Sequence, residues 1–288
     1  MKISECNNNL VLTNVNDFNL DNIFECGQCF RWNKTQDGGY IGVANNRALK
    51  IIQDGDTLTF FNTTLKDFDD IWFNYFDFNT DYSKIKTKLS NDSVLKKATE
   101  YGSGIRILNQ DLWECVVSFI ISASNNIPRI KKIINKLCEL YGDEILYMGG
   151  TYHSFPTPQK IYSLGLDALS HIKAGFRDKY IFSAAEFFCK QSDLSYLYGL
   201  DYDLAKKELM KINGIGNKVA DCILLFSLAK RNSFPVDVWI KRVIEHFYFD
   251  EKQSVENIQS FSTKKFGELG GYAQQYLFYY AREEKIGL

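Results

Sequence analysis

One stretch, residues 209–248, constrains the fold of this chain more than any other. A helical pattern ends near Met210, the turn Asn213-Gly214-Ile215-Gly216 follows, and a second helical pattern begins directly after it. Glycines give a tight turn the backbone freedom that it needs. We therefore predict two helices joined by this turn, a helix-hairpin-helix over about residues 204–230.

The start of the second helix is a candidate anion site. Asn217 is a suitable N-cap, and apolar residues then repeat at helical spacing. A glycine turn that opens a helix directs free backbone N–H groups outward, which favours a phosphate near Gly214 and Gly216. An ordinary helical hairpin without a ligand fits the same pattern.

Lys218 adds chemistry to this turn. The positive end of a helix dipole is unfavourable for an ammonium, and this favours the neutral, nucleophilic amine. If the helix runs from Lys218 to Lys230 it extends roughly 20 Å at about 1.5 Å per residue. The loop Arg231–Val236 can return a similar distance at about 3.3 Å per residue. Asp237 can then face Lys218, and it can also cap the helix that begins at Val238.

The motif Asn213-Gly-Ile-Gly-Asn-Lys218-Val-Ala-Asp-Cys222, followed by Pro235-Val-Asp237, resembles the helix-hairpin-helix DNA glycosylases, and within them the 8-oxoguanine DNA glycosylases. The resemblance implies that Lys218 attacks the sugar C1′ and that Asp237 stabilises the positive charge that develops. The implied activity is excision of 8-oxoguanine from duplex DNA by base flipping, with cleavage at the apurinic/apyrimidinic (AP) site through a Schiff base. No cofactor is required and no catalytic metal is implied, while a structural monovalent or divalent cation at the hairpin would suit the family.

The segment from about Phe24 to Asn62 has a β pattern. Asp37-Gly38-Gly39 and Asp54-Gly55 each separate two β-rich runs, which indicates antiparallel hairpins. Such hairpins need a covering layer of helices. We predict an α+β fold, and the family resemblance implies an N-terminal antiparallel β-sheet domain (TBP-like) over residues 1–100 and a mainly α-helical region over residues 101–288.

Gly27 lies in Gly-Gln-Cys-Phe-Arg-Trp, where the same family has Gly-Gln-x-Phe-Arg-Trp. Taken alone it would be a strand or bend glycine. The resemblance implies that its carbonyl meets the lesion, because 8-oxoguanine carries an N7–H donor that guanine lacks. Leaving that polar contact unmade costs about 1–3 kcal/mol, and only glycine lets the backbone come so close.

Gln274 and Phe278 are four residues apart in the last predicted helix and therefore share one face. An amide that bonds a base edge, beside a ring that stacks on it, suits a nucleobase pocket. A core phenylalanine on any helix fits equally well. The family uses matching residues in the pocket, and Cys222, one turn after Lys218, would form its opposite wall.

A polar loop interrupts two helical segments after the buried-looking run 113–121. Four basic residues and no acidic residue lie between Cys115 and Cys138, which suits phosphate contacts as well as a solvated helix face. Asn125, Asn126 and Arg129 resemble the family loop that fills the gap left by the extruded base and reads the orphaned cytosine. Ser124 replaces a family asparagine, so we expect weak selection of that cytosine.

The segment Ala174–Tyr180 resembles the family pattern Gly-Tyr-Arg-x-x-Tyr, with Phe176 in place of the wedge tyrosine. The resemblance implies that Phe176 pushes between bases and that Arg177 donates to the partner base, although Phe176 would also suit a core. Trp239 stands where the family has a histidine on the phosphate beside the lesion. We do not expect that contact here.

Composition limits the remaining classes. A net charge of −1 excludes a globally basic protein, so DNA binding requires a local patch. Cys26-x-x-Cys29 has no second pair to complete a zinc or iron–sulfur site. Scattered thiols suit a cytoplasmic protein, nucleoid-associated if bacterial, and no apolar run is long enough to span a bilayer.

The expected partner is double-stranded DNA containing 8-oxoguanine. We expect a monomer, because one pocket reads one lesion. Two alternatives stay open: a glycosylase for another damaged base, and a hairpin module that binds DNA without cutting it.

Overall fold

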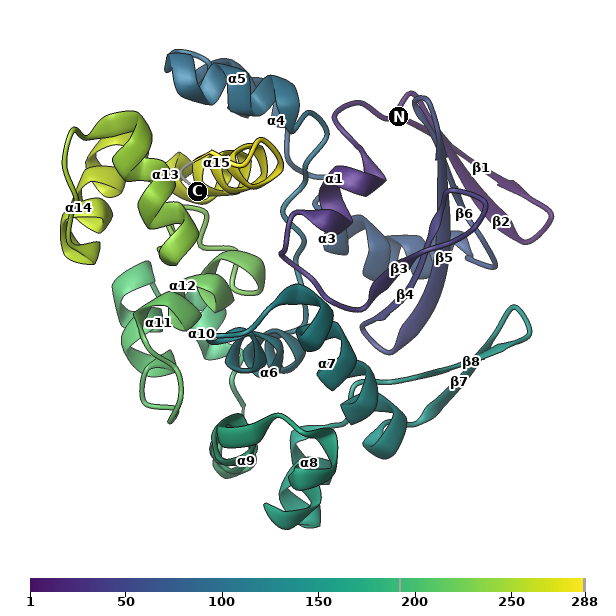
Figure 1. Cartoon of the computed structure of the whole chain (residues 1–288). Helices are drawn as coiled ribbons and strands as arrows, with labels where there is room; N and C mark the ends of the chain where they lie inside the picture. The colour runs from purple at the N-terminus through teal and green to yellow at the C-terminus, as the bar shows by residue number, and fades with distance from the viewer. Residues whose placement is uncertain (192, 287–288) are drawn as a thin grey trace.

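A six-stranded sheet lies beside a larger group of helices in the computed structural model, which describes residues 1–191 and 193–286 (Figure 1). The sheet order is β1-β2-β6-β5-β4-β3, and every neighbouring pair is antiparallel. The predicted α+β class is therefore confirmed. The strands are β1 (Lys2–Cys6), β2 (Asn9–Thr13), β3 (Trp32–Lys34), β4 (Tyr40–Ala44), β5 (Arg47–Asp54) and β6 (Thr57–Phe60).

Both predicted glycine turns join neighbouring strands. Thr35 N donates to Gly39 O at 2.9 Å between β3 and β4, and Asp54 pairs with Thr57 at the end of the β5–β6 hairpin. The prediction was wrong at the start of this segment, because Phe24 belongs to α1 (Leu20–Glu25). The apolar residues of α1 are spaced by three and four, which is helical periodicity.

The inner face of the sheet is covered by α1 and by the helical turns α2 (Leu65–Asp67), η1 (Phe68–Trp72) and α3 (Phe73–Tyr75). Alternate strand residues such as Leu58 and Phe60 are fully buried, as the two-residue period of a strand requires. Aromatic rings fill this first core, where the rings of Phe24 and Trp32 stack with centroids 4.3 Å apart.

The helices α4 to α15 enclose a second and larger core. Helix α6 is buried almost throughout and α7 begins after the polar loop, both as predicted, and Asn126 is the N-cap of α7. Their bounds are α4 (Tyr82–Leu89), α5 (Ser93–Tyr101), α6 (Leu112–Ser122), α7 (Ile127–Tyr141), α8 (Pro158–Leu164), η2 (Asp167–Ile172), η3 (Gly175–Arg177), α9 (Asp178–Lys190), α10 (Tyr196–Gly199), α11 (Tyr202–Leu209), α12 (Asn217–Phe226), α13 (Val238–Tyr248), α14 (Val255–Phe266), η4 (Gly267–Leu269) and α15 (Gly270–Glu283).

A small hairpin of β7 (Glu144–Tyr147) and β8 (Gly150–His153) leaves the helical region toward the sheet. Tyr152 lies in β8, and its ring centroid is 6.3 Å from that of Tyr147 in β7. The boundary predicted after residue 100 stays a prediction, although α4 and α5 pack in the second core.

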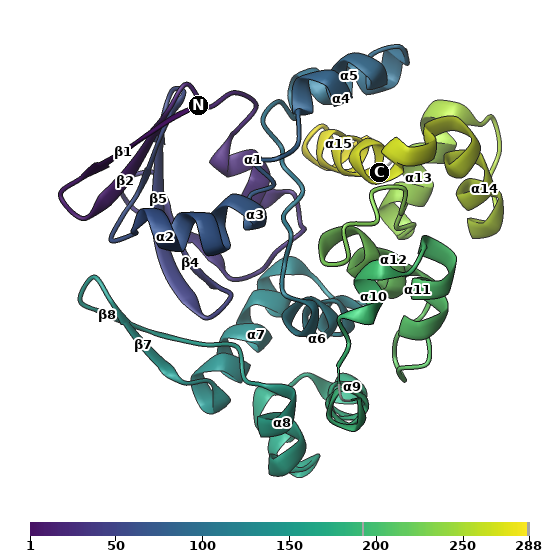
Figure 2. The same ribbon diagram turned by 180° about the vertical axis from the view of Figure 1, so that it is seen from behind.

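Helix α15 lies next to α1, so segments from opposite ends of the sequence meet, and this is visible from both sides (Figures 1 and 2). The predicted helix-hairpin-helix is formed by α11 and α12. Across the described residues, no helix has both the length and the apolar character needed to cross a membrane.

Candidate active site

The glycine turn between α11 and α12 is tightly packed on one side and open on the other. Gly214 has φ +91°, and a Cβ there would lie 2.5 Å from Cγ of Tyr180, so no other residue fits without movement. The N-cap of α12 is Gly216, whereas Asn217 was predicted. No side chain caps this end, and a Cβ on Gly216 would meet nothing within 4 Å. The first N–H groups of α12 therefore keep room for an anion.

Lys218 projects from the first turn of α12 and is half-buried against α6. Its Nζ lies 5.4 Å from the ring centroid of Phe119. Burial raises the pKa of the Cys222 thiol to about 11, and the Lys218 ammonium and its hydrogen bond to the sulfur oppose that rise. The Asp237 carboxylate adds to the same pKa rise. Lys218 and Asp237 therefore both lie near enough to Cys222 to affect the pKa of its thiol.

Asp237 also holds its own helix. Its Oδ1 accepts a hydrogen bond from Ile240 N at 2.8 Å, as an N-cap of α13. The capping role predicted from the sequence is therefore present, and the other carboxylate oxygen has no part in the cap. Helix α12 ends at Phe226, earlier than the predicted Lys230, so residues 227–236 make the return.

Gly27 lies against the last helix. It has φ +81°, and a Cβ there would be 3.2 Å from Cε1 of Phe278. Its neighbour Gln28 is completely buried, donates to Ile23 O at 2.9 Å and accepts from Leu108 N at 2.9 Å. Among the described residues no group donates to the Gly27 carbonyl oxygen. The Gly27 carbonyl oxygen therefore remains able to accept a hydrogen bond from a ligand.

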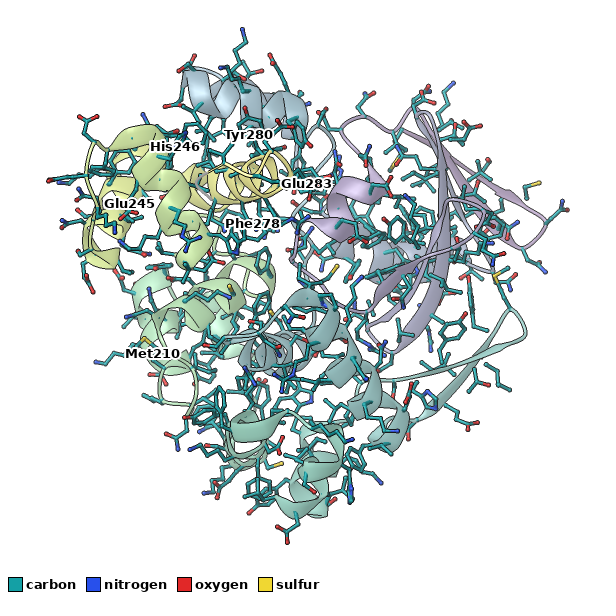
Figure 3. The ribbon with its side chains drawn as sticks, in the orientation of Figure 1. Met210, Glu245, His246, Phe278, Tyr280 and Glu283 are labelled. Atoms are coloured by element: carbon teal, nitrogen blue, oxygen red, sulfur yellow. The ribbon has the colours of Figure 1, made fainter. Side chains whose placement is uncertain are left out.

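The face of α15 that carries Phe278 also carries Gln274. Gln274 is 5% exposed, and its Oε1 accepts from Nε2 of Gln275 at 2.8 Å, which orients the amide. Phe278 is half-buried and lies near the middle of the molecule, between α15 and α12 (Figure 3). Gly27 and Phe278, which are 251 positions apart in the sequence, are thus in contact.

Two bonds that the sequence analysis missed attach α15 to α1. Arg282 Nη2 donates to Glu25 O at 2.5 Å, and Tyr279 Oη donates to Asn22 Oδ1 at 2.8 Å. The Arg282 guanidinium lies 5.7 Å from the ring centroid of Phe278. Its spacing of four from Phe278 was the only signal in the sequence.

The loop before α7 is held by its own polar side chains. Asn126 Oδ1 accepts from Arg129 N at 3.0 Å, and Asn125 Nδ2 donates to Ile121 O at 3.0 Å. Ser124 has φ +50°, and Arg129 is exposed. The loop therefore has a fixed shape and an exposed cation beside it.

Phe176 and Arg177 have opposite exposures. Phe176 is 56% exposed and so is not a core residue. Arg177 is 3% exposed, and its guanidinium donates to the carbonyl oxygens of Ala123, Ser124 and Ala174. This geometry makes Arg177 a brace for the loop, and the predicted donation to a partner base stays a prediction. Trp239 is half-buried in the first turn of α13.

Comparisons with known proteins agree with this architecture. The family model described as HhH-GPD superfamily base excision DNA repair protein matches residues 117–268, and that of the 8-oxoguanine DNA glycosylase N-terminal domain matches residues 10–116. A probable N-glycosylase/DNA lyase of Methanothermobacter thermautotrophicus is 31% identical over 73% of this chain and 74% of its own length.

Two solved structures superpose over nearly the whole chain. MBOgg1, in complex with a low-affinity DNA ligand, has a TM-score of 0.96 at 47% identity. The Clostridium acetobutylicum 8-oxoguanine glycosylase/lyase, in complex with DNA containing cytosine opposite 8-oxoguanine, has a TM-score of 0.96 at 41% identity. Each comparison covers 99% of both chains.

The fold and the site define a helix-hairpin-helix protein built around a lysine and an aspartate. The chain belongs to the HhH-GPD superfamily of base excision DNA repair proteins. Its first part is the N-terminal domain found in 8-oxoguanine DNA glycosylases.

Proposed function

We propose that this protein excises 8-oxoguanine from duplex DNA and then cleaves the strand at the resulting AP site. The observation that carries the proposal is the position of Lys218 on the first turn of α12, directly after the glycine turn. Asp237 is the N-cap of α13, and Gly27 contacts Phe278 of α15. The names of the similar proteins support the same activity.

The proposed reaction uses the amine of Lys218 as the nucleophile. Its nitrogen lone pair forms a bond to C1′ as the bond from C1′ to N9 of the base breaks, and the base leaves with the electron pair and takes up a proton. Asp237 stabilises the positive charge on the sugar. Ring opening gives a Schiff base, and loss of a proton from C2′ then expels the 3′ phosphate.

The proposed reading of the lesion depends on the Gly27 carbonyl. It accepts from N7–H of 8-oxoguanine, whereas guanine would present a lone pair there, and an unmade buried polar contact costs about 1–3 kcal/mol. Phe278 stacks on the extruded base, Gln274 bonds its edge, and Cys222 lies on the far side of the slot.

The proposed DNA contacts surround this slot. The hairpin amides at Gly214 and Gly216 hold the backbone, while Asn125, Asn126 and Arg129 occupy the gap in the duplex and Phe176 wedges the bases apart. A cation at the hairpin, the monomeric state and the cytoplasmic location stay predictions.

Borohydride trapping tests the proposal. The protein is incubated with an 8-oxoguanine duplex and borohydride, which reduces the Schiff base to a stable covalent adduct. We expect an adduct with the wild type and none with Lys218→Gln. Lys207→Gln, an exposed lysine of α11, is the matched control and should trap fully. An adduct that survives in Lys218→Gln removes Lys218 from the role, and trapping of a different lesion in preference to 8-oxoguanine favours the alternative glycosylase.

A further inference from the structure

Helix α7 carries a basic stripe of which the proposed DNA contacts use only Arg129. Its apolar residues face the core, and Arg129, Lys132 and Lys136 are all exposed on the other side. These three positions are separated by three and four residues, so they form one line along the helix.

A groove runs beside this line, and its other side carries one further cation, Lys173. The groove has a volume of about 910 Å³, and its other side is formed by the end of η2, where His171 is exposed, and by Lys173. Lys173 has φ +58° and terminates η2. Among the described residues that line the groove, Glu139 has the one acidic side chain, in a chain whose total charge is −1. The positive charge of this surface is therefore local.

Most of these cations are not neutralised by the protein. Lys136 lies 3.8 Å from Glu139, but this pair is exposed on both sides, and such pairs are weak. Within residues 1–191 and 193–286, Arg129, Lys132 and Lys173 form no ion pair. Lys131 differs, since its Nζ donates to Trp32 O at 3.0 Å.

The groove continues directly from the loop 122–126. Arg129 lies in the first turn of α7, whose N-cap is Asn126 in that loop. From Arg129 to Lys136 the stripe covers about 10 Å at about 1.5 Å per residue, which corresponds to roughly three base steps at about 3.4 Å each. Exposed cations in a line suit an extended polyanion, whereas a small anion would need groups that converge on one buried point.

We propose that this groove holds phosphates of the duplex that flanks the lesion, on the side of the loop 122–126. The proposal rests on the proposed function, because it takes DNA as the partner. It assigns Lys132, Lys136 and Lys173 to binding of the flanking backbone, which contributes affinity and no sequence information.

The test compares binding by a groove variant and a control variant. Lys132→Ala/Lys136→Ala/Lys173→Ala removes three groove cations. Lys88→Ala/Lys96→Ala/Lys97→Ala removes three exposed lysines from α4 and α5, which lie well apart from α7 in both views (Figures 1 and 2). Both are made in the Lys218→Gln background, so that no strand is cut, and binding to an 8-oxoguanine duplex is measured by fluorescence anisotropy over a range of salt concentrations.

We expect the groove variant to bind more weakly at low salt, with the slope of log K against log salt reduced by about 0.9 for each lost phosphate contact, or ~2.7 for three. The control should keep the parent's slope. Two further duplexes locate the contact, one shortened on the 5′ side of the lesion and the other on the 3′ side. The difference in affinity between the groove variant and its parent should vanish with one of these two duplexes. Equal slopes for groove variant and control, or a defect that persists with both shortened duplexes, would overturn the proposal.

Failure of the proposed function has a different signature. In that case the protein forms no covalent adduct with an 8-oxoguanine duplex, whether the groove lysines are present or substituted. If trapping by the wild type succeeds and the groove variant binds like the control, only the groove assignment fails.

Discussion

The candidate site has two parts that are built in different ways. We call Lys218 and Asp237 the chemical wall, and Gly27 and Phe278 the base wall. The chemical wall, with Lys218 and Asp237, comes from one continuous stretch around the α11–α12 turn. The base wall joins Gly27, from the segment between α1 and β3, to Phe278 on α15. Lys218 and Asp237 are thus placed by local structure, whereas the contact between Gly27 and Phe278 depends on how distant segments pack.

The two walls are also held by different forces. Beneath the turn, Lys206 pairs with Asp221 at 2.8 Å, and the carboxylate is 2% exposed. The base wall is held by the bonds of Arg282 and Tyr279 to α1, which are partly exposed. Substitutions should therefore destabilise the whole protein in the first case and affect base excision alone in the second.

The largest expected effect is on stability, from Lys206→Met. It leaves Asp221 buried without its cation, and breaking a buried pair in this way costs about 3–5 kcal/mol of unfolding free energy. Because burial raises the pKa of the Asp221 carboxyl, the deficit should shrink as the pH falls and the carboxyl takes up a proton. Urea unfolding at several pH values measures this. Lys207→Met, on the exposed face, is the control, and an equal loss in both variants would contradict the role of the buried pair.

Asp237→Asn is expected to have the next largest effect, and on the rate alone. Asparagine caps helices as well as aspartate does, so thermal stability should change little, whereas the loss of the carboxylate charge should slow excision by about 10²–10³-fold. Single-turnover kinetics with an 8-oxoguanine duplex measure the rate. A nearly wild-type rate would mean that the cap is the only role of Asp237.

Gly27→Ala tests the base wall. The new methyl group meets Phe278 at 3.2 Å on a backbone with φ +81°, so the carbonyl should lose its position and excision should slow by about 10–100-fold, equivalent to 1–3 kcal/mol. Cleavage of a duplex that already contains an AP site should be unchanged, because no base has to be read. Gly199→Ala, where a Cβ meets nothing within 4 Å, is the control. Equal loss of both activities would show that the two walls are not separable.

Arg282→Met should give the smallest effect. As with Gly27→Ala, we expect it to slow base excision but not AP-site cleavage. Removing the bond to Glu25 O costs about 1 kcal/mol, so excision should slow several-fold while AP-site cleavage stays unchanged. Arg282→Lys retains a donor and a charge and should recover part of the rate. If AP-site cleavage falls in parallel with excision, Arg282 does more than position the base wall.

Local patterns in the sequence predicted the chemical wall well. The glycine turn, both helices of the hairpin and the cap at Asp237 follow from short-range rules of backbone geometry, and the structure contains them all. The cap of α12 was missed by one residue, since Gly216 can take the N-cap conformation without a side-chain bond.

The base wall could be assigned only by resemblance. Nothing in periodicity brings Gly27 to Phe278, because their contact depends on the sheet, α1 and α15 packing together. The resemblance assigned Arg177 to a partner base. In the structure its buried guanidinium donates to three carbonyl oxygens, and this arrangement depends on tertiary packing that no sequence motif predicts. Likewise, the helical spacing in α1 was hidden next to a strong strand pattern.

The contact between Gly27 and Phe278 also has a consequence for synthesis on the ribosome. Lys218 and Asp237 emerge before α15, so for a time the nascent chain carries both residues without the helix that contacts Gly27. The contact between Gly27 and Phe278 forms only when α15 docks onto α1, so this part of the candidate site is completed last.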